Sequence, residues 1–189
     1  MKNKLIVIIL TIVILTTFIP VNVNAAGDEP SSWAKAEVSE AIEKGIVPER
    51  LQTKYQQTIT REEFASLFVQ MIFEASKDDY YKYTHDSPTR ELFLQQVKVL
   101  DFNFVDTKSE DIKIAYAMGL INGTSETTFE PDRAVTRQEA AVMISNVSGD
   151  VSWHRAGEWE EVVTDINSCG NWAKEQVLAS LANEYFSGT

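Results

Sequence analysis

The apolar residues of this chain recur with the period of an α-helix, and they do so in pairs of consecutive segments. A first stripe is followed, after a loop, by a second in which apolar residues recur at i, i+3, i+4, i+7 and i+8, as on one face of an amphipathic helix. Ser32 is the expected N-cap of the first helix, and Gly45 is its expected stop. The two stripes are Ala34, Val38, Ala41 and Ile42, and then Phe64, Leu67, Phe68, Met71 and Ile72.

The same arrangement recurs further along the chain. A helix is predicted from Asp111 to Gly119, and a partner helix carries Ala140, Met143, Ile144 and Val147. The first helix of a third unit begins at Asn171-Trp172-Ala173. We interpret all these stripes as core, and we find no alternating strand pattern. Because a helix–loop–helix unit cannot bury both of its faces alone, the units must stack, and the expected fold class is all-α.

Each second helix opens with a Thr-Arg-x-Glu motif. Thr60 with Glu63, and Thr136 with Glu139, have the spacing of a capping box, in which each side chain satisfies a backbone NH of the other. These four residues are therefore assigned to helix capping.

The arginines of the two motifs, Arg61 and Arg137, are 76 positions apart (137 − 61). Each occupies the first helical position, where the helix macrodipole disfavours a cation. We therefore expect each arginine to have a task beyond helix formation, with an anion as its partner. The alternative is a surface salt bridge, for instance to Glu62 or Asp132.

These patterns divide the chain into six segments, which include an extra helix that begins at Ser87-Pro88 and carries Leu92, Phe93, Val97 and Leu100. Residues 76–86 are expected to be a polar loop. The segments are a signal peptide (1–25), repeat 1 (26–75), an insertion with the extra helix (76–103), repeat 2 (104–148), a linker (149–162) and a partial repeat 3 (163–189).

The N-terminal segment is typical of a secretory signal peptide. Lys2 and Lys4 precede an apolar run from Leu5 to Ile19, and Val23-Asn24-Ala25 offers small residues for cleavage. We expect secretion and no membrane association after cleavage, although an uncleaved N-terminal anchor is the alternative.

The net charge of −11 becomes −13 (−11 − 2) without Lys2 and Lys4. Such an acidic surface argues against nucleic acid as a partner, and an anionic ligand would need a few placed cations. The single cysteine, Cys169, excludes an internal disulfide, and we interpret it as a small, partly buried residue.

Several spaced motifs in order resemble the S-layer homology (SLH) domain of bacterial surface proteins. Repeat 2 resembles it through Phe104-Val105-Asp106, Gly119 to Thr124, Phe129-Glu130-Pro131 and Thr136 to Glu139. Repeat 1 does so through Asp28, Trp33-Ala34, Gly45-Ile46 and Thr60 to Glu63. Repeat 3 resembles only the opening half, through Asp165, Trp172-Ala173 and Phe186 to Thr189.

This resemblance implies a secreted protein that attaches noncovalently to a pyruvylated secondary cell-wall polysaccharide, in the cell wall or S-layer of a Gram-positive-type bacterium. It also implies an incomplete pseudo-trimeric bundle, which self-association could complete at repeat 3. On this hypothesis Arg61 and Arg137 contact the ketal carboxylate. Asn122, Gly123 and Thr124 line a groove, and Trp33 and Trp172 are either groove walls or buried packing residues.

Other functional classes have less support in the sequence. The two histidines, His85 and His154, fall in predicted loops, so metal or triad chemistry is not expected, and neither is a cofactor. Carboxylates at Glu158, Glu160 and Glu161 are interpreted as a solvated run rather than a glycosidase pair. We expect no enzyme activity. The alternative function is a helical envelope-assembly or protein-binding factor that uses this fold without binding glycan.

Overall fold

The computed structural model describes residues 29–84, 90–97, 102–148, 159–160 and 163–185. This part of the chain is helical and contains no β-sheet, which confirms the all-α prediction; extended pairing is limited to one isolated bridge between Thr60 and Ala134. None of the helices in these ranges is both long enough and apolar enough to cross a membrane. The predicted signal peptide lies outside the described residues, as does most of the predicted linker.

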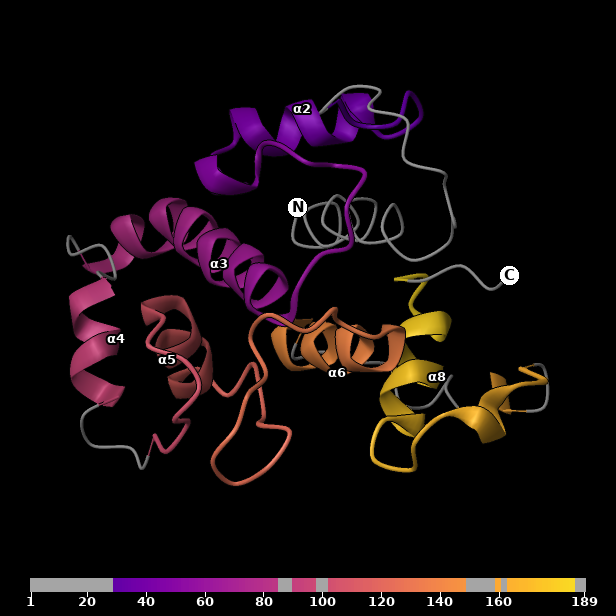
Figure 1. Cartoon of the computed structure of the whole chain (residues 1–189). Coiled ribbons are helices and arrows are strands. Elements are labelled where there is room, and N and C mark those ends of the chain that lie inside the picture. Colours follow the sequence, from indigo (N-terminus) through magenta and orange to yellow (C-terminus); the bar gives the residue numbers. More distant parts are fainter. Residues whose placement is uncertain (1–28, 85–89, 98–101, 149–158, 161–162, 186–189) are drawn as a thin grey trace.

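The described helices are grouped here by the segments predicted from the sequence (Figure 1). In repeat 1 they are α2 (Lys35–Glu43), the short 3-10 helix η1 (Glu49–Leu51) and α3 (Arg61–Thr84). The insertion contributes α4 (Arg90–Val97), and repeat 2 contributes α5 (Glu110–Ala117) and α6 (Arg137–Ser148). Repeat 3 contributes η2 (Ile166–Ser168) and α8 (Lys174–Ala182).

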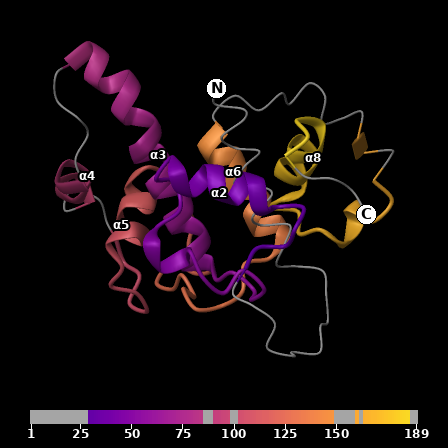
Figure 2. The same cartoon turned by 90° about the horizontal axis from the view of Figure 1, so that it is seen from above.

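In repeats 1 and 2 the second helix packs against the first helix of the next repeat. Helix α3 packs on α5 in this way, and α6 packs on α8, while α4 flanks α5 (Figures 1 and 2). The predicted stripes supply the core, in which Phe64, Leu67 and Phe68 are buried together with the apolar residues of α5 and α6. Leu181 and Tyr185 of repeat 3 join the same core. The repeats are therefore linked in series by one packing relation.

The first helices end where the sequence predicts. Gly45 and Gly119 follow the last helical turns with φ of +70° and +69°, a conformation that glycine adopts without a steric penalty. The predicted start at Ser32 is wrong. A turn in which the Ala34 NH donates to the Ser31 carbonyl makes the fully buried Ala34 the N-cap of α2.

The predicted loop after residue 75 is also wrong over residues 76–84, because α3 continues to Thr84. Residues 62–87 contain neither glycine nor proline, so nothing in this stretch stops a helix. Lys77 and Glu74 also form an i,i+3 ion pair of 2.6 Å on the extension. Residues 85–89, which include the predicted Ser87-Pro88 start of α4, lie outside the described part.

Candidate functional site

Both Thr-Arg-x-Glu motifs form the predicted capping boxes. The Thr60 NH donates to Glu63 Oε2 at 2.8 Å, and the Glu63 NH donates to Thr60 Oγ1 at 3.2 Å. The corresponding distances between Thr136 and Glu139 are 2.9 Å and 3.4 Å. The two helix starts are therefore locally equivalent.

The first motif lies beside the segment that leads into the second. Residues 59–62 run antiparallel to residues 131–135, so NH groups at the start of α3 that have no partner in their own helix find one in repeat 2. Three backbone hydrogen bonds join the segments: Arg61 NH to the Arg133 carbonyl at 2.9 Å, Glu62 NH to the Pro131 carbonyl at 3.0 Å, and Val135 NH to the Ile59 carbonyl at 3.2 Å.

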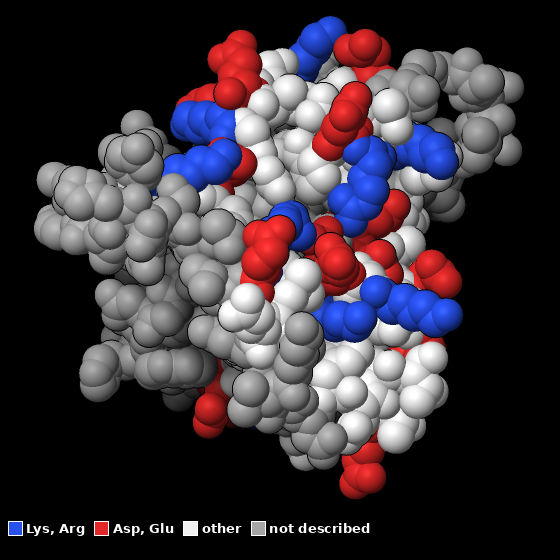
Figure 3. Space-filling view, turned by 90° about the vertical axis from the view of Figure 1, so that its left-hand side faces the viewer, with Lys and Arg blue, Asp and Glu red and all other residues white. Residues whose placement is uncertain are grey.

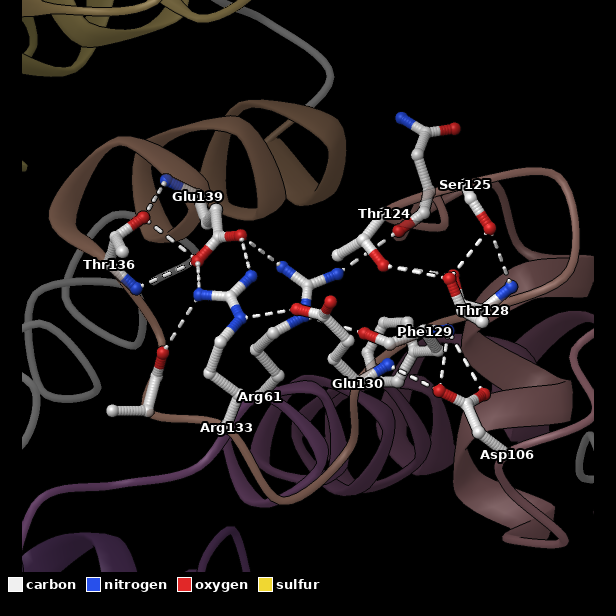
Figure 4. Close-up of polar contacts among 12 residues, drawn as sticks. Arg61, Asp106, Thr124, Ser125, Thr128, Phe129, Glu130, Arg133, Thr136 and Glu139 are labelled. Atoms are coloured by element: carbon white, nitrogen blue, oxygen red, sulfur yellow. Dashed lines mark hydrogen bonds and ion pairs between the residues drawn. The ribbon is translucent and has the colours of Figure 1, made fainter.

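Arg61 is inserted into repeat 2 and is only 3% exposed (Figure 4). Its Nη1 lies 2.7 Å from Glu139 Oε1, and its Nε donates to the Phe129 carbonyl at 2.8 Å. Its Nη2 donates to the Asn122 carbonyl at 3.2 Å, and the guanidinium carbon lies 4.5 Å from the centroid of the Phe129 ring. All three guanidinium nitrogens therefore have partners in the next repeat.

The capping glutamate of the second motif holds two arginines at once. Glu139 pairs with both Arg61 and Arg133 (Figure 4). Burial raises the pKa of Glu139, but hydrogen bonds from Arg133 and Thr136 and the charge of Arg61 bring that pKa below its ordinary value. Burial lowers the pKa of Arg61, and Glu139 partly offsets this effect. Because the pair is desolvated, removing Glu139 would leave the buried charge of Arg61 uncompensated.

Asp106 fixes the loop that accepts Arg61. Its carboxylate accepts hydrogen bonds from the Phe129 NH at 3.0 Å and the Glu130 NH at 2.8 Å (Figure 4). Burial raises the pKa of Asp106, and these backbone NH groups, together with the charge of Arg61, outweigh that effect and lower it. Sequence reasoning missed the roles of Asp106, Phe129 and Arg133. The one available signal was the arginine at an unfavourable helix position.

Arg137 has a different environment from Arg61. It is the first residue of α6 and is partly exposed. The neighbouring Gln138 side chain accepts a hydrogen bond from the Gly170 NH at 2.9 Å, so the start of α6 contacts repeat 3. Cys169, next to this contact, is partly buried as predicted.

The two predicted groove tryptophans are on the surface. Trp33 is 54% exposed and Trp172 is 57% exposed. Each directly precedes the N-cap of a first helix, α2 in repeat 1 and α8 in repeat 3, whereas Lys108 takes that place in repeat 2. The alternative that these tryptophans are buried in helix packing is therefore wrong.

The predicted loop Asn122-Gly123-Thr124 is shaped by internal contacts. A Cβ at Gly123 would lie 2.3 Å from the Ser125 carbonyl oxygen and 2.5 Å from the Phe104 ring, so the glycine serves close packing within the protein. The hydroxyls of Thr124, Ser125 and Thr128 hydrogen-bond to one another at the loop surface (Figure 4). This loop therefore exposes polar groups on a fixed backbone.

The charges on the molecule are mixed. Acidic and basic side chains lie next to one another on the face shown in Figure 3. Among the described residues, no three His, Cys, Asp or Glu side chains form a group that could hold a metal ion. His85, His154, Glu158 and Glu161 lie outside the described residues, and Glu160 pairs with Lys174.

Comparison with known proteins gives one family match and one relative. Residues 105–141 match the model of the S-layer homology domain family. The chain is also 29% identical over 128 residues to an endoglucanase of Bacillus sp. (strain KSM-635), an alignment that covers 65% of this chain and 12% of the endoglucanase. The chain thus spans a small part of that relative. No solved structure matches.

Domains of this family associate proteins with the cell surface, generally through cell-wall polymers. The matched range contains α5, the Asn122-Gly123-Thr124 loop, the Phe129 docking contacts and the second Thr-Arg-x-Glu motif. Residues 105–141 of this chain are therefore similar to the S-layer homology domain, and the comparison assigns the likeness to that range.

Proposed function

We propose that this chain is a secreted protein that binds noncovalently to a pyruvylated secondary cell-wall polysaccharide of a Gram-positive-type envelope. The observation that carries the proposal is the match of residues 105–141 to the S-layer homology domain, in a chain that also exposes two equivalently placed tryptophans. The proposed task is attachment of the chain to the wall or S-layer.

The exposed aromatic rings suit a sugar. Trp33 and Trp172 each present an indole ring at the entrance of a first helix, where the apolar face of a pyranose can stack on it. Asn122 and Thr124 add polar groups from a loop whose backbone is held by Arg61. These residues offer stacking and hydrogen bonding, which is the usual combination for a neutral part of a glycan.

Arg137 is the proposed contact for the ketal carboxylate. It stands at the first residue of α6, where a planar guanidinium can bind a carboxylate through two hydrogen bonds and the nearby helix NH groups favour an anion. The direct contact of Arg61 with the ligand stays a prediction, because its ion pair with Glu139 would have to open first. We assign Arg61 the task of holding the loop in place.

The proposed attachment requires no catalysis by this chain. The relative is named an endoglucanase, but the alignment covers only 12% of that protein. We propose that any such activity belongs to other parts of such proteins. A glycan-hydrolysis assay of this chain alone tests the point, and release of reducing ends would contradict it.

The wall-binding proposal is tested by pull-down with cell-wall sacculi that carry the polymer. Arg137→Gln and the double variant Trp33→Ala/Trp172→Ala should lower retention, whereas Lys35→Gln, which removes an exposed cation of α2, should not. Sacculi stripped of pyruvyl groups should retain less wild-type protein. Undiminished retention of both test variants would overturn the residue assignment. Failure of the wild-type protein to bind would favour the envelope-assembly alternative.

A further inference from the structure

Repeat 1 contains a counterpart of the segment on which the first motif docks in repeat 2. Lys54 and Glu130 are 76 positions apart (130 − 54), and both have a left-handed backbone conformation, with φ of 61° and 58°. The Gln57 NH donates to the Lys54 carbonyl at 2.9 Å, as the Arg133 NH donates to the Glu130 carbonyl at 3.2 Å. Residues 54–59 therefore repeat the backbone turn of residues 130–135.

The side chains around this turn in repeat 1 line an open pocket of about 140 Å³. In repeat 2 the corresponding space holds the Arg61 guanidinium. The pocket lining includes Thr53, Lys54, Gln57, Ile59 and Glu63, which are the counterparts of Phe129, Glu130, Arg133, Val135 and Glu139. We call this the repeat-1 pocket.

The backbone edge of the repeat-1 pocket offers the same hydrogen-bonding groups as repeat 2. The carbonyls of Tyr55 and Gln57 and the NH of Ile59 correspond to the three groups that bind the first motif. Within the described part of the chain, none of these three makes a hydrogen bond. Repeat 1 thus presents an acceptor–acceptor–donor edge beside the pocket.

We propose that the repeat-1 pocket binds the second Thr-Arg-x-Glu motif of another copy of this chain. The docking of Arg61 in repeat 2 is the template. Arg137 of the second copy would pair with Glu63 in place of the proposed glycan carboxylate, and the NH of Gln138, the counterpart of the docked Glu62 NH, would donate to the Tyr55 carbonyl. This contact uses repeat 1, so it is distinct from completion of repeat 3 by a neighbouring chain.

The charges predict a weaker contact than the internal one. Lys54 stands where repeat 2 has Glu130, and Thr53 stands where repeat 2 has the Phe129 ring. Glu63 is therefore the single carboxylate of the pocket, and the contact lacks the aromatic face under the guanidinium. We expect a reversible heterologous association, in which one chain gives the motif and the other gives the pocket.

Sedimentation equilibrium of the purified chain over a range of concentrations tests the proposal. Glu63→Gln keeps the capping hydrogen bonds but removes the charge, so it should raise the dissociation constant about tenfold. Glu62→Gln, one residue away and also partly buried, is the matched control and should not change it. Lys54→Gln should leave association unchanged or strengthen it, because it removes a repelling cation.

Two results would overturn the proposal. One is the mass of a single chain at every concentration. The other is the opposite dependence on charge, in which Lys54→Gln weakens association and Glu63→Gln does not. That result would indicate that the pocket binds an anion beside Arg50 and Lys54. The assay contains no cell-wall polymer, so its failure leaves the proposed function standing.

A disulfide trap tests the geometry directly. Thr58 and Thr136 are the counterparts of the bridged pair Ala134 and Thr60. Chains carrying Thr58→Cys, mixed with chains carrying Thr136→Cys, both in a Cys169→Ser background, should form a mixed disulfide dimer. A single chain with Thr60→Cys and Ala134→Cys is the positive control and should form an intramolecular disulfide. Closure of the control without formation of the mixed dimer would contradict the proposal.

Discussion

The two Thr-Arg-x-Glu motifs have the same local structure and different surroundings. Both open a helix with a capping box, but Arg61 is 3% exposed and paired with Glu139, whereas Arg137 is partly exposed at the start of α6. The difference arises in the next repeat, which supplies Arg61 with a carboxylate, two carbonyls and an aromatic ring. A local motif therefore specifies a helix start, while the neighbouring unit decides what its arginine does.

The largest predicted difference is in stability. Arg61→Ala should lower the free energy of unfolding by about 3–5 kcal/mol, because it leaves Glu139 short of a buried partner and two carbonyls without donors. Arg137→Ala should cost about 1 kcal/mol or less, as for an exposed ion pair. Urea denaturation measures both. Equal losses would contradict the difference in burial.

Replacing a glycine by alanine should destabilise the protein more in the loop that receives Arg61 than at the C-terminal end of α5 before it. Gly123→Ala should cost about 1–3 kcal/mol, because its Cβ would meet the Ser125 carbonyl and the Phe104 ring. Gly119→Ala has no atom within 4 Å of the new Cβ and should cost about 1 kcal/mol through its positive φ alone. Thermal unfolding of the two variants measures both losses of stability. A larger loss for Gly119→Ala than for Gly123→Ala would contradict this prediction.

Acid should weaken the docking of the two repeats. The folded-state pKa of Glu139 lies below the ordinary value of 4.5, and that of Asp106 is also lowered, so each contributes stability above its unfolded pKa. This contribution is lost as the pH falls through the lowered folded pKa. Denaturation as a function of pH should therefore show a loss of stability below about pH 4.5, and Glu139→Gln should flatten it. An unchanged acid slope in that variant would exclude Glu139 as a source.

The smallest predicted effects are equal in the two motifs. Thr60→Ala and Thr136→Ala each remove one side of a capping box and should each cost about 1 kcal/mol. Matched losses, measured by urea denaturation, would support the local equivalence of the helix starts. A much larger loss at one threonine would show that its cap also depends on the neighbouring repeat.

The sequence predicted the parts that depend on neighbouring residues. The capping boxes, the glycine stops and the buried stripes follow from short-range spacing, and the structure confirms them. The partner of Arg61 lies 78 positions away (139 − 61), and spacing alone cannot place two segments in register across that distance. The length of α3 was misjudged because its polar composition was given more weight than its lack of glycine and proline.

The exposure of the tryptophans shows the same limit. Trp33 and Trp172 precede buried alanines at the entrances of α2 and α8. The helical stripe correctly placed Ala34 on the core face, but it did not decide whether the adjacent tryptophan is covered. The small Ala34 and Ala173 are fully buried instead.

A double-mutant cycle tests the interlocking of the motifs most directly. The variants Arg61→Gln, Glu139→Gln and their combination give a coupling free energy from urea denaturation, and Arg137→Gln with Glu63→Gln gives a reference cycle in dilute solution. The predicted coupling is about 2 kcal/mol for Arg61 with Glu139, and about zero for the reference pair within one chain. A coupling near zero for Arg61 with Glu139 would contradict the conclusion that the arginine of the first motif is held by the glutamate of the second.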